Sequence, residues 1–595
     1  MAKSNIYKQS APGSFKSKKK IAIIAVISVV LVAALAVSAL LFIYNETVDR
    51  IVSVVEKTVD KNVDRIHNLL DKFIDHFTKP NPEEEPPKGE ESLPPMLDPI
   101  KDNYRTFYQV FVGSFSDSNG DTYGDLRGLI NRFDYLNDGN INSGKSLGVQ
   151  GIWLSPIFSS PSYHKYDAKD YYKIDWRFGD MNDLRELAQL CEERNVKLIL
   201  DLAINHTSSQ HEWFLQFKKA RMEGDTSNPY YDYYTCVTTE EKVGGRAYQK
   251  IAGVDAWFEC NFSGDMPELN FDNPTVREEM LKVAQYYMEL GVDGFRFDAI
   301  KYIYYGDTQK SVDFWEWYMG ELKKDYPDIY CVGECWSGES EILDYYSAMN
   351  CFNFAMSQAE GKAAMAAKGT SSVSTFTNYI ESYQKSVLAN NPDGMPMSFL
   401  SNHDMDRIAG TFVTENYMRM AANLYLLSPG SPTIYYGEEI GIRGSRGSAN
   451  TDANRRLAML WGDGDTVGNP IGSTYDSSKQ ISTTVADQLE DPNSLYNYYC
   501  KLIAIRHKYE AIARGTYNSI SCGQKKAGGF LITYGEEKIG LFHNTSTEEL
   551  SIDLAGCTDL AGHSFAAILD VIGTGDAKLE GTVLTIAPQT SVILG

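Results

Sequence analysis

The chain has 595 residues, which is more than one compact core holds, so we expect two or three domains. Hydrophobic residues make up 43% and charged residues 23% of the chain, a composition typical of globular proteins rather than disordered ones. The formal net charge of -23 argues against a nucleic-acid partner, because binding to phosphates requires clustered Lys and Arg.

The N-terminal part has the pattern of a membrane anchor. Residues 1–20 are polar and end in a lysine cluster, and residues 21–44 form an apolar run without a charged side chain, long enough to span a bilayer as a helix. The lysines predict a cytoplasmic N-terminus and a single-pass protein of the cell membrane whose remaining domains are extracellular. The alternative is a secreted protein with a signal peptide cleaved after Ala39, although the apolar run exceeds an ordinary signal core.

Residues 45–78 follow a three-four spacing of apolar side chains, which predicts a helical stalk. The stalk is either a coiled coil through which the protein self-associates or an amphipathic helix that lies on the membrane or on the globular part. Residues 79–99 are rich in Pro and Glu and predict a linker.

From residue 100 to about residue 510, short apolar segments alternate with segments of helical length. The expected strands are Thr106–Ser114, Gly151–Ser155, Val196–Ala203, Gly294–Asp298, Ile329–Gly333, Asn350–Ala355, Met397–Ser401 and Thr433–Tyr436. Helices expected between them include Met181–Arg194, Pro274–Leu290 and Ser311–Asp325. This alternation predicts an α/β fold, a closed parallel (β/α)8 TIM barrel with its active site at the C-terminal ends of the strands.

Two further domains are expected around this barrel. Residues 207–262 are rich in Tyr, Thr and Gly without a strong helical pattern, and we interpret them as a small inserted domain. Residues 511–595 consist of short alternating segments, which predict a C-terminal antiparallel β-sandwich.

Nine cysteines are present, and none has the spacing of a Cys-x-x-Cys pair or of a zinc site. We expect mostly free, buried thiols. A disulfide between Cys236 and Cys260 is the alternative that the sequence leaves open.

Four strand ends carry acidic and basic groups. They are DLAINH with Asp201, Asn205 and His206, GFRFDAIK with Arg296, Asp298 and Lys301, VGECW with Glu334, and FLSNHD with His403 and Asp404. A single carboxylate after a strand is usually a helix N-cap, but three on one face of a barrel are difficult to explain in that way.

Converging carboxylates suit cleavage of a glycosidic bond, in which one acid protonates the leaving oxygen and a carboxylate attacks the anomeric carbon. Arg296 and Asp298 share a strand face, and the guanidinium keeps the carboxylate ionised, so Asp298 is the candidate nucleophile. Glu334 has less polar neighbours, which predicts a raised pKa and the role of acid. Asp404 is expected to bind sugar hydroxyls and to favour the distorted ring.

The segment DSNGDTYGD carries oxygen groups at alternate positions. Such a loop suits calcium, and the expected ligands are the side chains of Asp117, Asn119, Asp121 and Asp125 with the carbonyl of Tyr123. The final bidentate Glu of an EF-hand is missing, and a merely polar turn is the alternative.

The motifs GVQGIWLSPIF, DLAINH, MPELN, GFRFDAIK, GEC and FLSNHD follow one another in an order that resembles the α-amylase family of retaining glycoside hydrolases (family 13), over roughly Tyr104 to the C-terminus. The resemblance implies Asp298 as nucleophile, Glu334 as acid/base and Asp404 as transition-state stabiliser. It also implies Tyr166 as a ring-stacking platform at the cleavage subsite, which His206, Arg296 and His403 would complete. The insertion would be the family's domain B and the sandwich its domain C.

Finer features of this resemblance bear on the substrate. Ala299 and Lys301 match amylase-like members and imply α-1,4 linkages, whereas Tyr302 replaces a histidine that helps to hold calcium beside domain B in many amylases. RRLAMLW resembles a motif of oligosaccharide-cleaving members, which implies that Arg456 pairs with Asp167 and that substrates are short. Related members carry calcium at the DSNGDTYGD loop.

We therefore expect a hydrolase of α-1,4-glucosidic bonds in starch-like polysaccharides or maltooligosaccharides. Glucosyl transfer is the alternative among enzymes, because a sugar can intercept a covalent intermediate in place of water. A non-catalytic amylase-like subunit of a membrane transporter is disfavoured, because no cysteine follows the membrane segment before Cys191 and the three carboxylates are all present. The same carboxylates disfavour a starch-binding protein without turnover.

Overall fold

The structure, a computed structural model, describes residues 100–140, 143–560 and 562–595. The predicted cytoplasmic segment, membrane helix, stalk and linker (residues 1–99) lie outside these residues. Among the helices of the described ranges, none combines the length and the apolar character needed to cross a bilayer.

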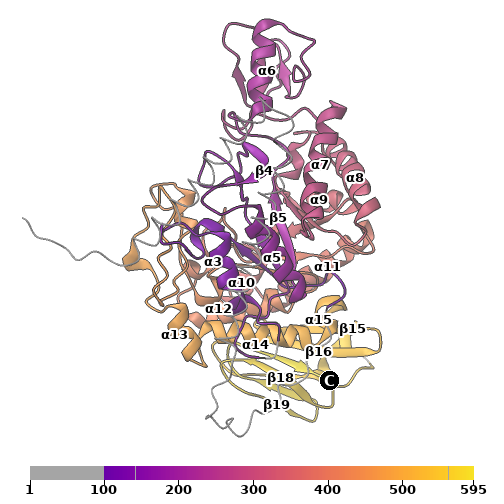
Figure 1. The fold of residues 1–595 in the computed structure, drawn as a ribbon. Helices are drawn as coiled ribbons and strands as arrows, with labels where there is room; N and C mark the ends of the chain where they lie inside the picture. Colours follow the sequence, from indigo (N-terminus) through magenta and orange to yellow (C-terminus); the bar gives the residue numbers. More distant parts are fainter. Residues whose placement is uncertain (1–99, 141–142, 561) are drawn as a thin grey trace, which may run out of the picture. The chain divides into compact units, whose positions relative to one another are not determined.

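Eight parallel strands form the central sheet (Figure 1). They are β1 (Phe107–Val110), β2 (Gly151–Leu154), β5 (Lys197–Leu202), β9 (Gly294–Phe297), β10 (Tyr330–Gly333), β11 (Asn350–Asn353), β12 (Met397–Ser398) and β13 (Thr433–Tyr435). Their order is β12-β11-β10-β9-β5-β2-β1-β13. The N–H of Ser431 donates to the carbonyl of Pro396 (2.9 Å), which joins the segments leading into β13 and β12. Each predicted strand contains one observed strand, and the barrel fold is confirmed.

The inside of the barrel is filled by side chains from alternate strand positions. Phe107, Trp153, Ile199, Tyr330 and Val332 belong to one buried cluster there. Their alternation with outward-facing residues follows from the two-residue period of a strand.

Gly294 begins the strand that carries the candidate nucleophile. A Cβ on this residue would lie 1.8 Å from the carbonyl oxygen of Tyr330 on the neighbouring strand, so only glycine fits. The register of β9 against β10 therefore depends on Gly294.

Helices cover the outside of the barrel. They include α3 (Leu126–Asn131), α5 (Met181–Glu193), α7 (Pro274–Glu289), α8 (Thr308–Asp325), α9 (Glu339–Asp344), α10 (Lys362–Ala367), α11 (Val373–Asn390), α12 (Glu415–Leu426), α13 (Val485–Glu490), α14 (Leu495–Lys508) and α15 (Glu510–Arg514). Helix α5 begins with a capping box between Asp180 and Asp183 and buries Leu184, Leu187 and Cys191 along one face.

The insertion contains the three-stranded antiparallel sheet β6 (Cys236–Val237), β8 (Trp257–Glu259) and β7 (Tyr248–Lys250). It also contains α6 (Glu212–Glu223), a helix in the segment whose sequence shows no strong helical pattern. Helix α6 buries only Phe214, Phe217 and Ala220, a stripe too narrow to give a strong helical pattern. Figure 1 shows α6 at one end of the ribbon, away from the C-terminal strands.

The C-terminal part consists of two antiparallel sheets. One has the order β14 (Thr516–Ile520), β15 (Ala527–Tyr534), β16 (Glu537–Asn544), β21 (Thr590–Leu594) and β18 (Ile568–Gly573). The other has the order β17 (Leu550–Asp553), β20 (Val583–Ile586) and β19 (Ala577–Glu580). Asn423 of α12 donates to the carbonyl of Ile572 (3.0 Å), which joins the barrel to this part.

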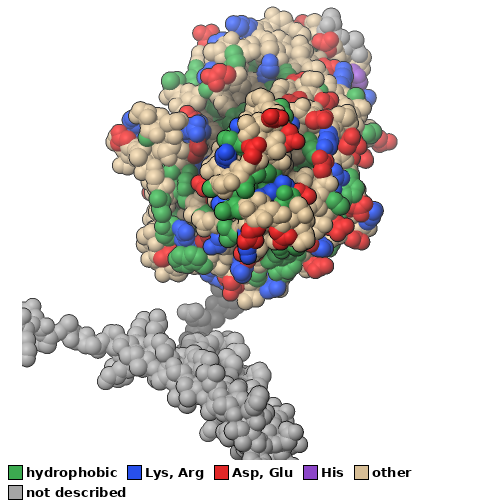
Figure 2. Space-filling model, turned by 90° about the horizontal axis from the view of Figure 1, so that it is seen from above, with side chains coloured by type: hydrophobic (Ala, Val, Ile, Leu, Met, Phe, Trp, Pro, Cys, Tyr) green, Lys and Arg blue, Asp and Glu red, His purple; other side chains and the backbone are tan. Residues whose placement is uncertain are grey.

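All nine cysteines are free thiols. The surface of the described residues carries both acidic and basic side chains. Figure 2 shows Asp and Glu side chains scattered over one face, with Lys and Arg among them and hydrophobic side chains between.

Candidate active site

Arg296 is the centre of the candidate active site. Its side chain is buried and points to the interior of the barrel, because it alternates with Phe295 and Phe297 along β9. Nη1 lies 2.7 Å from Oδ1 of Asp298 and 2.8 Å from Oδ1 of Asp201. One guanidinium therefore pairs with the candidate nucleophile and with a second carboxylate from the neighbouring strand β5.

Glu334 follows β10 and reaches the same centre. Its Oε2 lies 3.9 Å from Nη2 of Arg296 and accepts a hydrogen bond from the N–H of Ala299 (3.0 Å). Ala299 has a left-handed backbone (φ 45°), a strained conformation for alanine that turns this N–H toward Glu334. Burial raises the pKa of Glu334 to about 7, and the negative charges of Asp298 and Asp404 add to this. A carboxyl group with this pKa carries a proton near neutral pH, as a general acid must.

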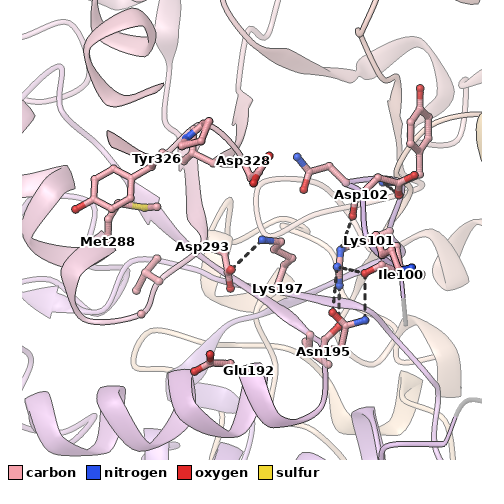
Figure 3. A pocket seen from close by; sticks show the side chains of 18 of the residues that line it. Ile100, Lys101, Asp102, Glu192, Asn195, Lys197, Met288, Asp293, Tyr326 and Asp328 are labelled. Carbon is pink, nitrogen blue, oxygen red and sulfur yellow. Dashed lines mark hydrogen bonds and ion pairs between the residues drawn. The ribbon is translucent and has the colours of Figure 1, made fainter. Parts of the chain in front are cut away.

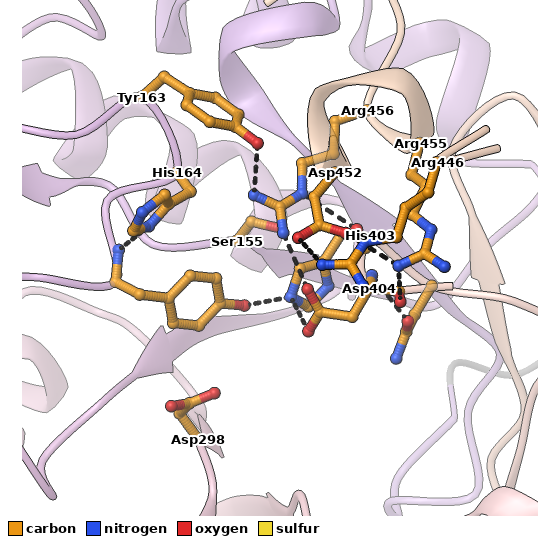
Figure 4. Close-up of polar contacts among 12 residues, drawn as sticks. Ser155, Tyr163, His164, Asp298, His403, Asp404, Arg446, Asp452, Arg455 and Arg456 are labelled. Carbon is orange, nitrogen blue, oxygen red and sulfur yellow. Dashed lines mark hydrogen bonds and ion pairs between the residues drawn. The ribbon is translucent and has the colours of Figure 1, made fainter. Parts of the chain in front are cut away.

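Asp404 belongs to a network of charged groups after β12 (Figure 4). Its Oδ2 lies 3.0 Å from Nε2 of His403 and its Oδ1 lies 2.8 Å from Nη2 of Arg456. Burial acts to raise the pKa of Asp404, but His403 and Arg456 outweigh it and hold the pKa below its ordinary value. Asp404 is therefore an anion while Glu334 is poised to be an acid.

Tyr166 lies beside this network. Its ring stacks on that of His403 at 5.4 Å, and its hydroxyl contacts Nε2 of His403 (2.5 Å) and donates to Oδ2 of Asp201 (2.8 Å). The other ring nitrogen of His403 is 2.7 Å from Nε2 of Gln109, on β1. The sequence interpretation omitted Gln109, although a lone amide within the apolar strand FYQV was a signal for it.

Two further predicted site residues lie at the same end of the barrel. His206 is buried and its ring contacts that of Phe262 at 5.2 Å, and neither ring nitrogen has a hydrogen-bond partner within the described residues. Burial lowers the pKa of His206, so its imidazole is neutral and can bond a ligand hydroxyl. Lys301 donates to the carbonyl of Trp336 (2.8 Å), which ties the loop after β9 to the loop after β10.

The predicted pair between Arg456 and Asp167 is wrong in this structure. Arg456 bonds Asp404, and Asp167 accepts hydrogen bonds from the hydroxyls of Ser160 and Ser162. The physical reason is that the buried guanidinium finds a carboxylate at 2.8 Å after β12, whereas two serine hydroxyls already satisfy Asp167.

The predicted calcium ligands occupy one loop, but their oxygens bond chiefly to that loop. Oδ1 of Asp117 accepts from the N–H of Asn119 and of Gly120, and Oδ1 of Asp121 accepts from the N–H of Tyr123. Among the described residues, no three acidic, His or Cys side chains are grouped so that they could hold a metal ion.

One feature of this loop nevertheless fits a cation. Asp125 is buried, and its partners Ser118, Asn119 and Gly128 are all neutral donors. Burial raises its pKa, and the nearby charge of Asp117 adds to the effect. The expected metal ligands are thus all oxygen atoms. One of them belongs to a buried carboxylate, that of Asp125, which no basic side chain of the described chain neutralises.

A hollow of about 420 Å³ opens beside Asp404. Its lining residues are Trp336, Gln358, Asp404, Met405, Arg446, Asp452 and Arg455. The exposed ring of Trp336 stacks on Phe354 at 5.3 Å, so it is held as a platform at the mouth of the site. Among these lining residues, Asp452 pairs with Arg446 (2.8 Å) and Arg455 (2.9 Å), and Figure 4 labels all three.

A larger cavity of about 1130 Å³ lies at the opposite, N-terminal ends of the strands (Figure 3). Its side chains include Arg105, Lys197 and Asp293, which stand at the beginnings of β1, β5 and β9, and Lys197 pairs with Asp293 at 3.0 Å. None of the predicted site residues lines this cavity.

Comparisons with known proteins agree with this geometry. The family model described as "Alpha amylase, catalytic domain" matches residues 109–515. Alpha-amylase 3 of Dictyoglomus thermophilum is 35% identical over 481 residues, covering 79% of this chain and 88% of that protein. Oligo-1,6-glucosidase of Bacillus cereus is 30% identical over 508 residues, covering 72% and 88%. The solved structure of Eubacterium rectale Amy13B superposes with a TM-score of 0.76 at 34% identity and covers 83% of this chain and 96% of that one.

Proposed function

The chain belongs to the α-amylase family of glycoside hydrolases, and from this premise we propose that it is a retaining hydrolase of α-1,4-glucosidic bonds. Its substrates would be starch-like polysaccharides or maltooligosaccharides. The observation that carries the proposal is the convergence of Asp298, Glu334 and Asp404 on one network around Arg296 and His403. Three carboxylates with different partners can perform three different tasks.

The division of labour follows from the contacts. Asp298, paired with Arg296, attacks the anomeric carbon and forms a glycosyl–enzyme bond. Glu334, whose pKa is raised to about 7 by burial, protonates the departing oxygen and then takes a proton from the attacking water. Asp404 bonds the sugar hydroxyls and stabilises the positive charge of the distorted ring, and Tyr166 stacks on that ring.

Glucosyl transfer is the second candidate, and the hollow beside Trp336 favours it. An acceptor sugar can stack on this exposed ring, next to the carboxylates, and compete with water for the covalent intermediate. The ratio of transfer to hydrolysis would then rise with the concentration of acceptor.

We assign calcium to the DSNGDTYGD loop as a structural ion. The buried carboxylate of Asp125, with only neutral donors around it, supports this assignment. Asp117, Asn119, Asp121 and the carbonyl of Tyr123 would complete the ligands. Calcium would stiffen the loop after β1 without contacting substrate. Chelation with EDTA is expected to lower the melting temperature, and an unchanged value contradicts the assignment.

For the N-terminus we propose the membrane anchor at residues 21–44, supported by the length of its uncharged apolar run. Fractionation of expressing cells tests it. Recovery with the membrane fraction after a high-salt wash is expected. A mature protein that starts near Leu40 in the medium contradicts it. Self-association through the stalk is tested by the sedimentation of the full chain.

Product analysis by chromatography tests the enzyme proposal. The full chain is incubated with amylose, pullulan and maltotriose, beside the Asp298→Asn variant as a control for contaminating activity. A ladder of maltooligosaccharides from amylose is expected from the wild type alone. If none of these glucans is cleaved, the proposed hydrolase activity is refuted. Products longer than the substrate would favour glucosyl transfer.

A further inference from the structure

Two large apolar side chains stand in water beside the candidate active site. Trp176 is 79% exposed and Ile471 is 62% exposed. Single exposed apolar residues are ordinary, but a group of them on one rim marks a binding surface.

Segments far apart in the sequence build this rim. Trp176 lies in the turn after β4 (Asp170–Ile174), and the guanidinium of Arg177 lies 5.4 Å from its ring and 5.3 Å from the ring of Tyr123. Ile471 follows a segment that is bonded to the loop of Tyr123, because the N–H of Gly468 donates to the carbonyl of Thr122 (2.8 Å). Arg177 thus joins the two rings, and this bond holds Ile471 close to them.

The rim is continuous with the candidate active site. Tyr163, Arg177, Tyr123 and Ile471 line one small hollow of about 20 Å³. The hydroxyl of Tyr163 accepts from Nη1 of Arg456 (3.2 Å), and Arg456 bonds Asp404. A chain of direct contacts therefore leads from a candidate catalytic carboxylate to the hollow. We call Tyr123, Tyr163, Trp176 and Ile471 the aromatic rim.

We propose that the aromatic rim binds glucose units of the α-glucan chain beyond those at the bond to be cleaved, an inference that rests on the function proposed above. Pyranose rings present C–H faces that stack on the flat, polarisable face of a tryptophan, and their hydroxyls bond the neighbouring polar groups. The exposed part of the rim is ring and aliphatic surface, so it suits a neutral sugar chain rather than an ionic ligand. Long substrates reach it and short ones do not.

The test compares substrates of two lengths. We would measure KM and kcat of the full chain and its Trp176→Ala variant with maltotriose and with maltoheptaose. Loss of one stacking contact is expected to raise KM for maltoheptaose by roughly three- to tenfold. KM for maltotriose and both values of kcat should not change. Tyr534→Ala, at a 40% exposed tyrosine of the C-terminal sheet, is the matched control and should behave as wild type. Equal changes for both sugars, or none, overturn the proposal.

A binding measurement separates this inference from the proposed function. If the wild type cleaves neither sugar, the hydrolase fails, and the rim is then tested alone by native electrophoresis in gels that contain amylose. Asp298→Asn should be retarded by amylose, and Asp298→Asn with Trp176→Ala should be retarded less. If these two variants have equal mobility, whether or not amylose retards them, the proposal that the aromatic rim binds glucan is overturned.

Discussion

The ion pair between Lys165 and Asp175 stabilises the loop that carries Tyr166. Nζ of Lys165 lies 2.6 Å from Oδ2 of Asp175, and the two side chains are only 2% and 3% exposed. Lys165 has a left-handed backbone (φ 67°), which a non-glycine residue adopts at a cost of about 1 kcal/mol. The pair therefore holds the backbone in an unfavourable conformation directly before Tyr166.

Substitution of Lys165 by Met removes the cation and leaves Asp175 buried. Breaking a buried ion pair costs about 3–5 kcal/mol, whereas replacing both charges by neutral groups is often nearly neutral. Nε of Arg177 remains 3.4 Å from the other oxygen of Asp175, so we expect a loss at the lower end, about 3 kcal/mol. The cost of the left-handed backbone at position 165 does not enter this difference, because Met and Lys have the same cost there.

Urea unfolding followed by tryptophan fluorescence measures this difference in the free energy of unfolding. Lys282→Met, which removes an exposed pair with Glu279, is the control and should stay within about 0.5 kcal/mol of wild type. Lys165→Met with Asp175→Asn should recover most of the lost stability. The reasoning is refuted if Lys165→Met is as stable as the control, or if the double variant is as unstable as Lys165→Met alone.

Four further predictions concern the site and its surroundings. Asp298→Asn should lower kcat by at least about 10³-fold, and residual activity above one hundredth would exclude Asp298 as the nucleophile. Because Glu334 must carry a proton and its pKa is raised to about 7, kcat should fall as pH rises through about 7, and a flat profile to pH 9 would contradict its role as the acid. Arg456→Lys should raise KM for maltotriose several-fold, because the lysine loses the bond to Tyr163 while it keeps a charge for Asp404. An equal rise of KM in Asp167→Asn would instead support the pair between Arg456 and Asp167 that the sequence predicted. Burial raises the pKa of Glu438 to about 8, so its contribution to stability is complete below about pH 4.5 and is lost as pH rises through 8; melting curves of Glu438→Gln should lack this decline, and parallel curves would assign it to other groups.

The order of the barrel strands along the chain, and the polar residues at their ends, could be predicted from the amino-acid pattern alone. A strand buried on both faces is a continuous apolar run, and polar residues directly after it must lie at the C-terminal edge of the sheet. For this reason Asp298, Glu334 and Asp404 could be assigned to one site before any contact was known. Gly294 is likewise a residue whose identity follows from its immediate surroundings, since its backbone approaches Tyr330 too closely for any side chain.

The hydrogen-bond and ion-pair partners of these groups, by contrast, became known from the folded structure. Tyr166 meets His403 across 237 positions of the chain, and Arg456 bonds Asp404 rather than Asp167. Such choices depend on where the folded chain places the competing acceptors, which spacing along the chain does not encode. Helix α6 and the aromatic rim could not be predicted for a related reason. The helix buries too few residues to impose a period, and the rim exists only where three distant parts of the chain meet.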